Sequence, residues 1–464
     1  RNLSPNSNRT VDHLGSYDLS QYNFTSEENA PPGAVVGTVH ATDADNDTLS
    51  YSITSGNSDH VFSIDGAGNI IVTGILNFES ASSRDLVVTT SDPASHSDGT
   101  AVHVAIQDVS EPTSASLTSS AGLSIGGTQY GATTGFVLPG AGNVTTPGTP
   151  EDSITLGYTF NGTTSVVVAD PMLHRTDFAS IGTASYTADG TSYFSSILSA
   201  GHGITLSQTI ALGSDASYFK TTIDIYNGSG SEISDIRFMR NIDPDQDVDA
   251  HGVYNTLNDV IQNPTRTSSI AAVVATGPVS GVQVMFVGDD GGTWRGSAFG
   301  FTNINPYDSY AFSNPQDPNG QSGDIGMSFT NQIGTLAAGG HAEISFITTA
   351  NVATAGADAL VGTPGADTLN GHGGGDILFG LGGADTFVFN AGFGKDTVAD
   401  FAHGADILQF DSDVFASAQD VIDHLVTYAN GNAVITYDAA NTVTLDHVTT
   451  LSPSDIVIHN IMTS

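Results

Sequence analysis

The sequence contains no cysteine and very few basic residues. Without cysteine, neither disulfide bonds nor thiolate metal ligands can stabilise the fold. Ten lysines and arginines stand against 49 aspartates and glutamates, so the formal net charge is −39 at pH 7. This charge repels phosphate backbones, which excludes nucleic acid as an expected partner. Divalent cations with oxygen ligands are natural counter-ions for so many carboxylates, and a solvated acidic surface is the alternative.

Long apolar runs are also lacking. No run of about 18 apolar residues occurs, so we expect no transmembrane segment. Residues 1–20 read as a polar tail without the apolar core of a secretory signal. We therefore expect either that a signal preceded Arg1 or that export uses information elsewhere in the chain.

Helical periodicity is rare, and short runs rich in β-branched residues dominate. Glycine, serine, threonine and asparagine separate these runs, which predicts strands and turns. The clearest runs are residues 34–40, 164–169, 220–226, 282–287 and 342–348. The best helical pattern is 417–428, where Ser417 can cap and Val421, Leu425 and Tyr428 share a face. The sequence predicts an all-β fold with one short helix.

Composition changes divide the 464 residues into three expected domains after the tail. Acidic and proline-bearing residues 108–113 end the first unit, and small residues 349–354 precede a glycine-rich stretch. We predict a first domain at 21–112, a large middle β-sandwich at 113–350 and a third domain at 351–464.

The most specific pattern is a nine-residue repeat. Asp358, Asp367, Asp376 and Asp385 are nine residues apart, and each is followed two positions later by an apolar residue. The best copies, 371–379 and 380–388, match the pattern G-G-x-G-x-D-x-U-x. Glycines permit turns with positive φ and close approach of carbonyls to an ion, while the apolar residue faces inward. The repeat predicts a parallel β-roll in which calcium ions lie between successive turns.

Residues 353–464 resemble the RTX (repeats-in-toxin) family of bacterial proteins, and 392–410 resembles the region after their repeats. The resemblance implies type I secretion through a C-terminal signal and folding triggered by extracellular calcium. The array is short and His372 replaces one glycine, so the number of ion sites stays open. The candidate calcium ligands are Asp358, Gly362, Gly365, Asp367, Gly371, Gly373, Gly374, Asp376, Gly380, Gly382, Gly383, Asp385, Asp396 and Asp406.

Residues 21–112 resemble a cadherin domain. The pieces that carry the resemblance are EEN at 27–29, VHATDADND at 39–47, YSI at 51–53, LNFE at 76–79, VVTTSD at 87–92 and DVSE at 108–111. The resemblance implies a seven-stranded sandwich with calcium-binding carboxylates at both ends. By position, one end would hold Glu28, Glu79 and Asp108, and the other would hold Asp43, Asp45 and Asp92. The alternative is that these acids cap strands and stabilise turns.

An acidic loop at 241–249 places Asp243, Asp245 and Asp247 at alternate positions. This spacing lets a loop wrap several oxygens around one ion, although the glycine and distal glutamate of an EF-hand are missing. Calcium binding and a solvated turn both stay open.

The sequence assigns no catalytic residue. The zinc-protease pattern H-E-x-x-H does not occur, because the HAE at 341–343 lacks a second histidine. The letters of G-x-S-x-G occur at 122–126, but no helical pattern follows. Trp294, Tyr307 and Tyr310 could line a carbohydrate-binding surface, with core packing as the alternative.

Together these features predict a secreted calcium-dependent structural or adhesive protein of a bacterial surface or extracellular matrix. An adhesin, a surface-layer component and a filament subunit all fit. The expected partners are further copies of the chain, a cell-surface glycan or polysaccharide, and a type I exporter. The alternative is a secreted polysaccharide-active enzyme whose active site lies in the middle sandwich.

Overall fold

The structure is a computed structural model. It describes residues 22–28, 30, 33–42, 47–58, 60–74, 76, 78, 81–93, 97–108, 114–138, 142–143, 151–170, 175–244, 246–265, 268–288, 291, 293–298, 304–311, 321–323, 325–424 and 426–459.

The N-terminal part is a seven-stranded sandwich, as expected. One sheet has the order β1 (Tyr22–Glu27), β7 (Ser97–Gln107), β6 (Ser83–Ser91) and β3 (Ser50–Ser55). The other has the order β2 (Val35–Thr38), β5 (Asn69–Val72) and β4 (Phe62–Ile64). Alternate residues of β6 and β7, such as Val88 and Val104, are buried in the core between the two sheets.

The middle part contains three sheets. A small sheet contains β8 (Ser114–Thr118), β9 (Ser124–Thr128), β10 (Thr133–Leu138) and β11 (Gly142–Asn143). A six-stranded sheet has the order β14 (Arg175–Thr176), β13 (Thr163–Asp170), β12 (Glu151–Phe160), β19 (Ile233–Asp243), β25 (Met327–Leu336) and β23 (Trp294–Ala298). A nine-stranded sheet has the order β15 (Ala179–Ala188), β16 (Thr191–Gly201), β17 (Ile204–Gly213), β18 (Tyr218–Asn227), β26 (His341–Thr349), β22 (Gln283–Gly288), β21 (Ala271–Thr276), β20 (Thr256–Gln262) and β24 (Gln321–Gly323).

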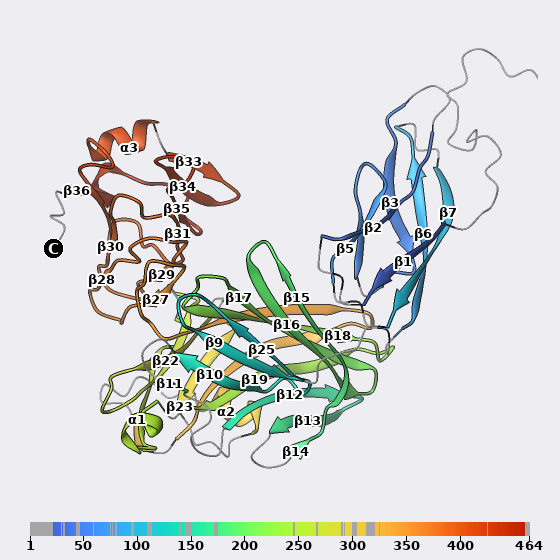
Figure 1. Cartoon of the computed structure of the whole chain (residues 1–464), viewed down its shortest axis with the longest axis horizontal. Coiled ribbons are helices and arrows are strands. Elements are labelled where there is room, and N and C mark those ends of the chain that lie inside the picture. The colour runs from blue at the N-terminus through green and yellow to red at the C-terminus, as the bar shows by residue number, and fades with distance from the viewer. Residues whose placement is uncertain are drawn as a thin grey trace, which may run out of the picture.

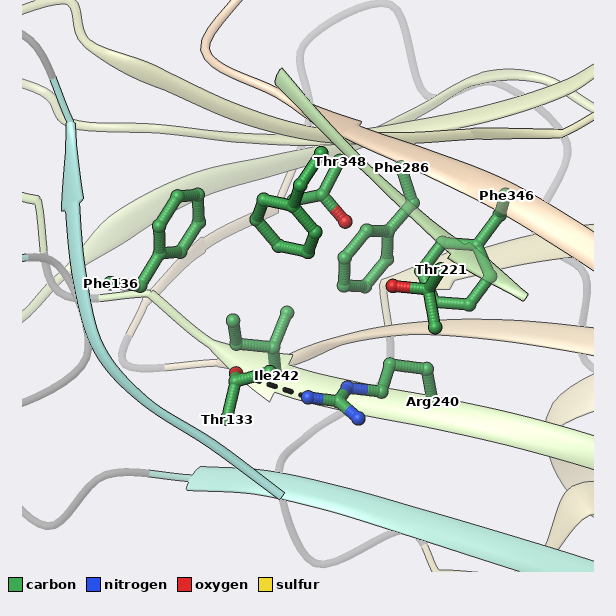
Figure 2. A pocket seen from close by; sticks show the side chains of 9 residues that line it. Thr133, Phe136, Thr221, Arg240, Ile242, Phe286, Phe346 and Thr348 are labelled. Atoms are coloured by element: carbon green, nitrogen blue, oxygen red, sulfur yellow. Dashed lines mark hydrogen bonds between the residues drawn. The ribbon is translucent and has the colours of Figure 1, made fainter. Parts of the chain in front are cut away.

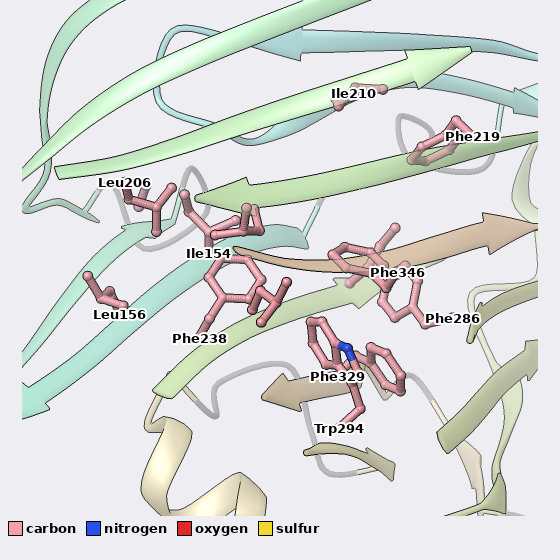
Figure 3. Packing of buried hydrophobic residues seen from close by; sticks show 14 of the residues in the cluster. Ile154, Leu156, Leu206, Ile210, Phe219, Phe238, Phe286, Trp294, Phe329 and Phe346 are labelled. Carbon is pink, nitrogen blue, oxygen red and sulfur yellow. The ribbon is translucent and has the colours of Figure 1, made fainter. Parts of the chain in front are cut away.

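The two large sheets pack face to face around one core (Figure 3). Strand β17 alternates buried and half-buried residues along its whole length, which places Leu206 and Ile210 in this core. Trp294 is fully buried and stacks on Phe329 with ring centroids 4.5 Å apart. Two short helices, α1 (Val248–His251) and α2 (Pro306–Ala311), interrupt the strand pattern and were not expected.

The C-terminal part is a parallel β-roll, as expected. One sheet has the order β27 (Ala359–Val361), β29 (Ile377–Phe379), β31 (Lys395–Val398), β35 (Thr442–Leu445), β34 (Asn432–Thr436) and β33 (Val426–Ala429). The other has the order β28 (Thr368–Leu369), β30 (Thr386–Phe389), β32 (Ile407–Asp411) and β36 (Ile456–His459), and η2 (Pro453–Asp455) precedes β36. Ala359 pairs with Ile377, and Thr368 with Thr386, so one full turn of the roll takes 18 residues, or two nine-residue repeats.

The expected helix is present but shorter. Helix α3 (Ala418–His424) follows Ser417, whose Oγ accepts the Asp420 N–H at 3.1 Å. The prediction of helix to residue 428 was wrong, because Tyr428 lies in β33. Asn430 and Gly431, with φ of 54° and 85°, form the tight turn that pairs β33 with β34.

The five expected strand runs are all present, as β2, β13, β18, β22 and β26. Figure 1 shows the blue N-terminal sandwich and the orange-to-red roll on different sides of the green-to-yellow middle part. Only the roll shares a buried apolar cluster with the middle part among the described residues.

Candidate calcium sites

The repeat aspartates form two ladders, one at the start of each sheet of the roll. In the first ladder, Oδ1 of Asp376 accepts the Asp358 N–H at 2.9 Å, and Oδ1 of Asp396 accepts the Asp376 N–H at 3.0 Å. In the second, Asp385 accepts the Asp367 N–H and Asp406 accepts the Asp385 N–H, each at 2.9 Å. The structure therefore brings the six predicted aspartates together in two stacks, one carboxylate per turn.

Glycines make room for these carboxylates. A Cβ on Gly371 would collide with Asp376 Oδ2, and a Cβ on Gly380 would collide with Asp385 Oδ2. Gly374 has a φ of +131°, and a Cβ there would collide with the carbonyl oxygen of Gly356 in the neighbouring turn. The predicted glycines thus leave a cradle lined by carboxylate and carbonyl oxygens, the ligands that calcium prefers.

Burial makes the ladder carboxylates costly to ionise without an ion. Asp376 is only 1% exposed, and its Oδ2 has no hydrogen-bond partner. Burial raises the pKa of Asp376 to about 8; the Asp358 N–H opposes this shift, and the negative charge of Asp396 adds to it. Burial also raises the pKa of Asp396 to about 7 and that of Asp385 to about 6. A bound cation would remove this cost, because it provides the missing partner for the charge.

In the first two nine-residue repeats, a threonine hydroxyl satisfies the aspartate carboxylate. The Thr354 hydroxyl donates to Asp358 Oδ1, and the Thr363 hydroxyl donates to Asp367 Oδ2, each at 2.9 Å. In the next two repeats, His372 and Leu381 occupy the position of these threonines. Both have a left-handed backbone conformation, and neither side chain offers the aspartate a hydroxyl. Asp376 and Asp385 are therefore the strongest candidates for ion ligands.

Two further aspartates were absent from the candidate ligands drawn from the sequence. Asp400 accepts the N–H groups of Gly380 and Leu381 at 2.8 and 2.7 Å, which fixes the glycine turn beside the second ladder. Asp455 is fully buried and accepts the Gly404 N–H at 3.0 Å. Neither lies on the nine-residue spacing. Asp400 occupies one of the acidic places that the resemblance of 392–410 to the region after RTX repeats implies, whereas no sequence pattern indicated Asp455.

The candidate residues of the N-terminal sandwich lie at its two ends where they are described. Parallel strands β1 and β7 end together, so Glu28 and Asp108 follow at the same end. Glu28 is buried and accepts the Phe78 N–H at 2.8 Å. Asp92 follows β6 at the opposite end. Asp43, Asp45 and Glu79 lie outside the described residues, so their roles stay predictions.

The acidic loop of the middle part is partly a strand and partly a turn. Asp243 ends strand β19 and is buried. Asp247 accepts the N–H groups of Val279 and Ser280 at 2.7 and 3.1 Å, which stabilises that turn. Asp245 lies outside the described residues. The calcium role of this loop stays a prediction.

Carboxylates alone do not complete any of these sites. Within the described ranges, no three Asp, Glu, His or Cys side chains are arranged to hold a metal ion. Calcium takes six to eight oxygens, so an ion in the roll would need the carbonyl oxygens of the glycine turns as well as one or two carboxylates.

A buried polar cluster lies beside a small cavity in the middle core (Figure 2). The cavity measures about 10 Å³, room for about one water molecule and too small for a sugar. Arg240 borders it and pairs with the buried carboxylate of Asp152, and it donates to Gly131 O at 2.9 Å. The pair ties β10, β12 and β19 together. At residues 122–126, Ser124 begins strand β9 instead of a strand-to-helix turn, so the structure does not form a nucleophile elbow there.

Comparisons with known proteins match both ends of the chain. Residues 22–107 match the model of the cadherin domain, and residues 352–387 match the RTX calcium-binding nonapeptide repeat in four copies. The chain carries both modules. Cadherin domains and RTX repeats are calcium-binding families, and RTX repeats are typical of proteins exported by type I secretion.

Individual relatives with protocadherin names match about a fifth of the chain. Protocadherin-16 of Mus musculus is 32% identical over 114 residues, which cover 20% of this chain and 4% of that protein. The Protocadherin-like wing polarity protein stan of Drosophila melanogaster is 35% identical over 101 residues, which cover 21% of this chain and 3% of that protein. The chain thus spans only a small fraction of the length of these relatives.

Solved structures of cadherin domains match a similar share of the chain. The crystal structure of chicken VE-cadherin EC1-2 aligns with 27% identity and a TM-score of 0.17, over 19% of this chain and 47% of that one. The solution structure of the third cadherin domain of human protocadherin 7 aligns with 21% identity and a TM-score of 0.20, over 23% of this chain and 93% of that one. In the described parts of the chain, no helix has the length and apolar character needed to cross a membrane.

Proposed function

We propose that this protein is a calcium-dependent structural or adhesive protein of a bacterial surface or extracellular matrix. The main support for this proposal is the pair of aspartate ladders. Their buried carboxylates face glycine turns, and Asp376 Oδ2 has no hydrogen-bond partner. A cadherin domain at the other end of the chain fits the same role, because it belongs to a second calcium-binding family.

Calcium would serve as a structural ion. A net charge of −39 repels itself, and each bound divalent cation offsets two of these charges. In the roll, the residues that would hold the ion are Asp376 and Asp385 with the carbonyl oxygens of the neighbouring glycine turns. Low calcium inside the cell would leave the roll unfolded during type I export, and higher calcium outside would fold it.

The proposed domains are a cadherin-like domain at 21–112, a middle sandwich at 113–350 and the RTX region at 351–464. In this arrangement the middle sandwich connects two calcium-stabilised modules. The proposed adhesive contact is with further copies of the chain, as in a filament or surface layer, or with a cell-surface glycan.

The proposal is tested with beads coated with the purified chain. Calcium should cause the beads to cluster or to bind bacterial cells, and chelation should disperse them. Replacing both Asp376 and Asp385 with Asn should reduce clustering to the level seen with chelator, because two buried ion ligands are lost. The matched control is Asp413→Asn, an exposed aspartate of the same roll that lies after the end of β32 and accepts no hydrogen bond in the described part of the chain. Calcium-loaded protein that stays monomeric and binds neither cells nor glycans would contradict the proposal.

A further inference from the structure

The roll is packed against the outer face of the nine-stranded sheet. A separate buried apolar cluster joins the two parts, and none of its buried members belongs to the roll core or to the sandwich core. These buried members are Ile270, Ala272, Val274, Met285, Val287 and Ile347 from the middle part and Ala359, Val361, Phe379 and Leu381 from the roll.

The roll strands of this interface have two apolar faces. In β27, Leu360 points into the roll core while Val361 packs in the interface cluster. In β29, Leu378 points into the roll core while Phe379 packs in the interface cluster. Strand β28 of the other sheet carries exposed Thr368 instead. Both residues that flank the inward apolar position are apolar in β27 and β29, whereas one of them is a threonine in β28 and β30 (Thr368 and Thr386), which marks the β27–β29 sheet as the docking face.

The middle strands are two-faced in the same way. Val273 of β21 and Phe286 of β22 belong to the sandwich core, whereas their neighbours Val274 and Val287 belong to the interface cluster. Both faces of these strands are buried, which accounts for their continuous apolar sequences AAVVA and VMFV. Without the roll, one of these faces would be exposed to water.

Polar contacts fix the position of the roll. The side chain of Asn351 pairs with both backbone groups of Val361: Oδ1 accepts its N–H at 2.7 Å and Nδ2 donates to its carbonyl at 3.1 Å. Thr349 Oγ1 donates to the carbonyl of Ala359 at 2.8 Å, and the Ser217 N–H donates to the carbonyl of Ala357 at 2.9 Å. These contacts hold β27, the edge strand of its sheet, against the end of β26.

The docking residues lie within a few residues of the candidate ion ligands. Val361 is three residues after Asp358 and Phe379 is three residues after Asp376, each at the end of the short strand that begins directly after that aspartate. Order that an ion gives to a ladder aspartate would therefore extend to the strand that covers the middle sheet.

We propose that calcium bound in the roll stabilises the middle sandwich through this interface, and that loss of calcium uncovers the apolar outer face of β21, β22 and β26. This inference rests on the proposed calcium site of the roll. It adds that the roll is an ion-controlled cover for another domain of the same chain.

The only tryptophan gives a domain-specific readout. Trp294 lies in the sandwich core at 0% exposure, so its fluorescence reports unfolding of the middle part. Thermal unfolding of the full chain is followed at Trp294 with calcium and with chelator, while calorimetric titration measures calcium binding directly. For the unmodified chain we expect calcium to raise the midpoint temperature of the unfolding transition reported by Trp294. With chelator we expect stronger binding of an apolar dye, because the outer face of the middle sheet is uncovered.

Two variants test the route. The Val361→Ser and Phe379→Ser variants should still bind calcium. The calcium-induced increase in their midpoint temperature, followed at Trp294, should fall to half or less of the increase in the unmodified chain. The matched control is Val457→Ser, since Val457 lies on the other sheet of the roll and is 40% exposed, against 4% for Val361. The control should keep the full shift.

The outcomes separate this inference from the calcium proposal. Calcium binding by the unmodified chain with no shift at Trp294 would overturn the coupling and leave the calcium site standing. If the calcium-induced increase in midpoint temperature at Trp294 is equal in the two interface variants and the control, the interface does not carry the stabilisation. If the titration detects no calcium binding, the calcium proposal fails and the coupling falls with it.

Discussion

At the scale of single residues, the buried ladder carboxylates are controlled by protons when calcium is absent. In the folded chain burial raises the pKa of Asp376 to about 8 from its ordinary value of 3.8, so between these two pH values the folded state holds a proton that the unfolded state has lost. The stability of the calcium-free roll should therefore fall as pH rises from about 4 to about 8.

Calcium should reverse this trend, because it binds the ionised carboxylates and displaces their protons. Urea unfolding of the roll, monitored by hydrogen exchange at several pH values, measures how its stability depends on pH with and without calcium. A calcium-free roll that gains stability between pH 5 and pH 8 would contradict the assignment of buried, ion-free carboxylates to the ladders.

Gly374 tests the glycine cradle. Its φ of +131° suits glycine alone, and a Cβ would collide with the Gly356 carbonyl, so Gly374→Ala should destabilise the roll by about 1–3 kcal/mol. Gly375→Ala is the matched control, because its Cβ would have only an ordinary contact at 3.4 Å with the Lys395 carbonyl oxygen and should change stability by less than about 0.5 kcal/mol. Denaturant midpoints of the two variants give the comparison, and equal midpoints would refute the steric role.

At the scale of elements, the side chain of Asn351 protects the edge of strand β27 at Val361. Asn351 has a φ of 57°, so Asn351→Gly removes the amide that pairs with Val361 without straining the backbone. We expect a loss of about 1–3 kcal/mol and faster amide exchange at Val361, since a buried donor and acceptor lose their partner. Asn430→Gly is the control: Asn430 also has positive φ, 54°, but it lies in an exposed turn, so exchange at Val361 should stay slow.

The elements that local pattern determines could be predicted from the sequence. Nine-residue spacing predicted the roll because each repeat makes the same turn, and Ser417 predicted the start of α3 because capping is local. The end of α3 could not be predicted as easily, since residues 426–429 gain more from pairing with β34 than from continuing the helix. The docking face of β27 and β29 could not be predicted from the repeat, because Val388 of β30 is apolar as well and the nine-residue pattern does not show which sheet of the roll meets the middle part.

At the scale of the whole molecule, the sequence predicted three β-rich parts and left their contacts undefined. Strand β19 lies between β12 and β25, which are separated by about 170 residues of chain, and no local pattern specifies such pairing. The same limit applies to the candidate ion sites. Spacing predicted Asp358, Asp367, Asp376 and Asp385, and the resemblance of 392–410 to RTX proteins added Asp396 and Asp406. Asp455 is brought to the Gly404 N–H only by the folded backbone.

The central claim is that ions held by the two ladders order the roll. Hydrogen exchange of the full chain, measured with calcium and after exhaustive chelation, tests it most directly. The account predicts that amides of β29, β30 and the glycine turns between them are protected with calcium and exchange rapidly after chelation. Equal protection of these amides in both conditions would contradict it.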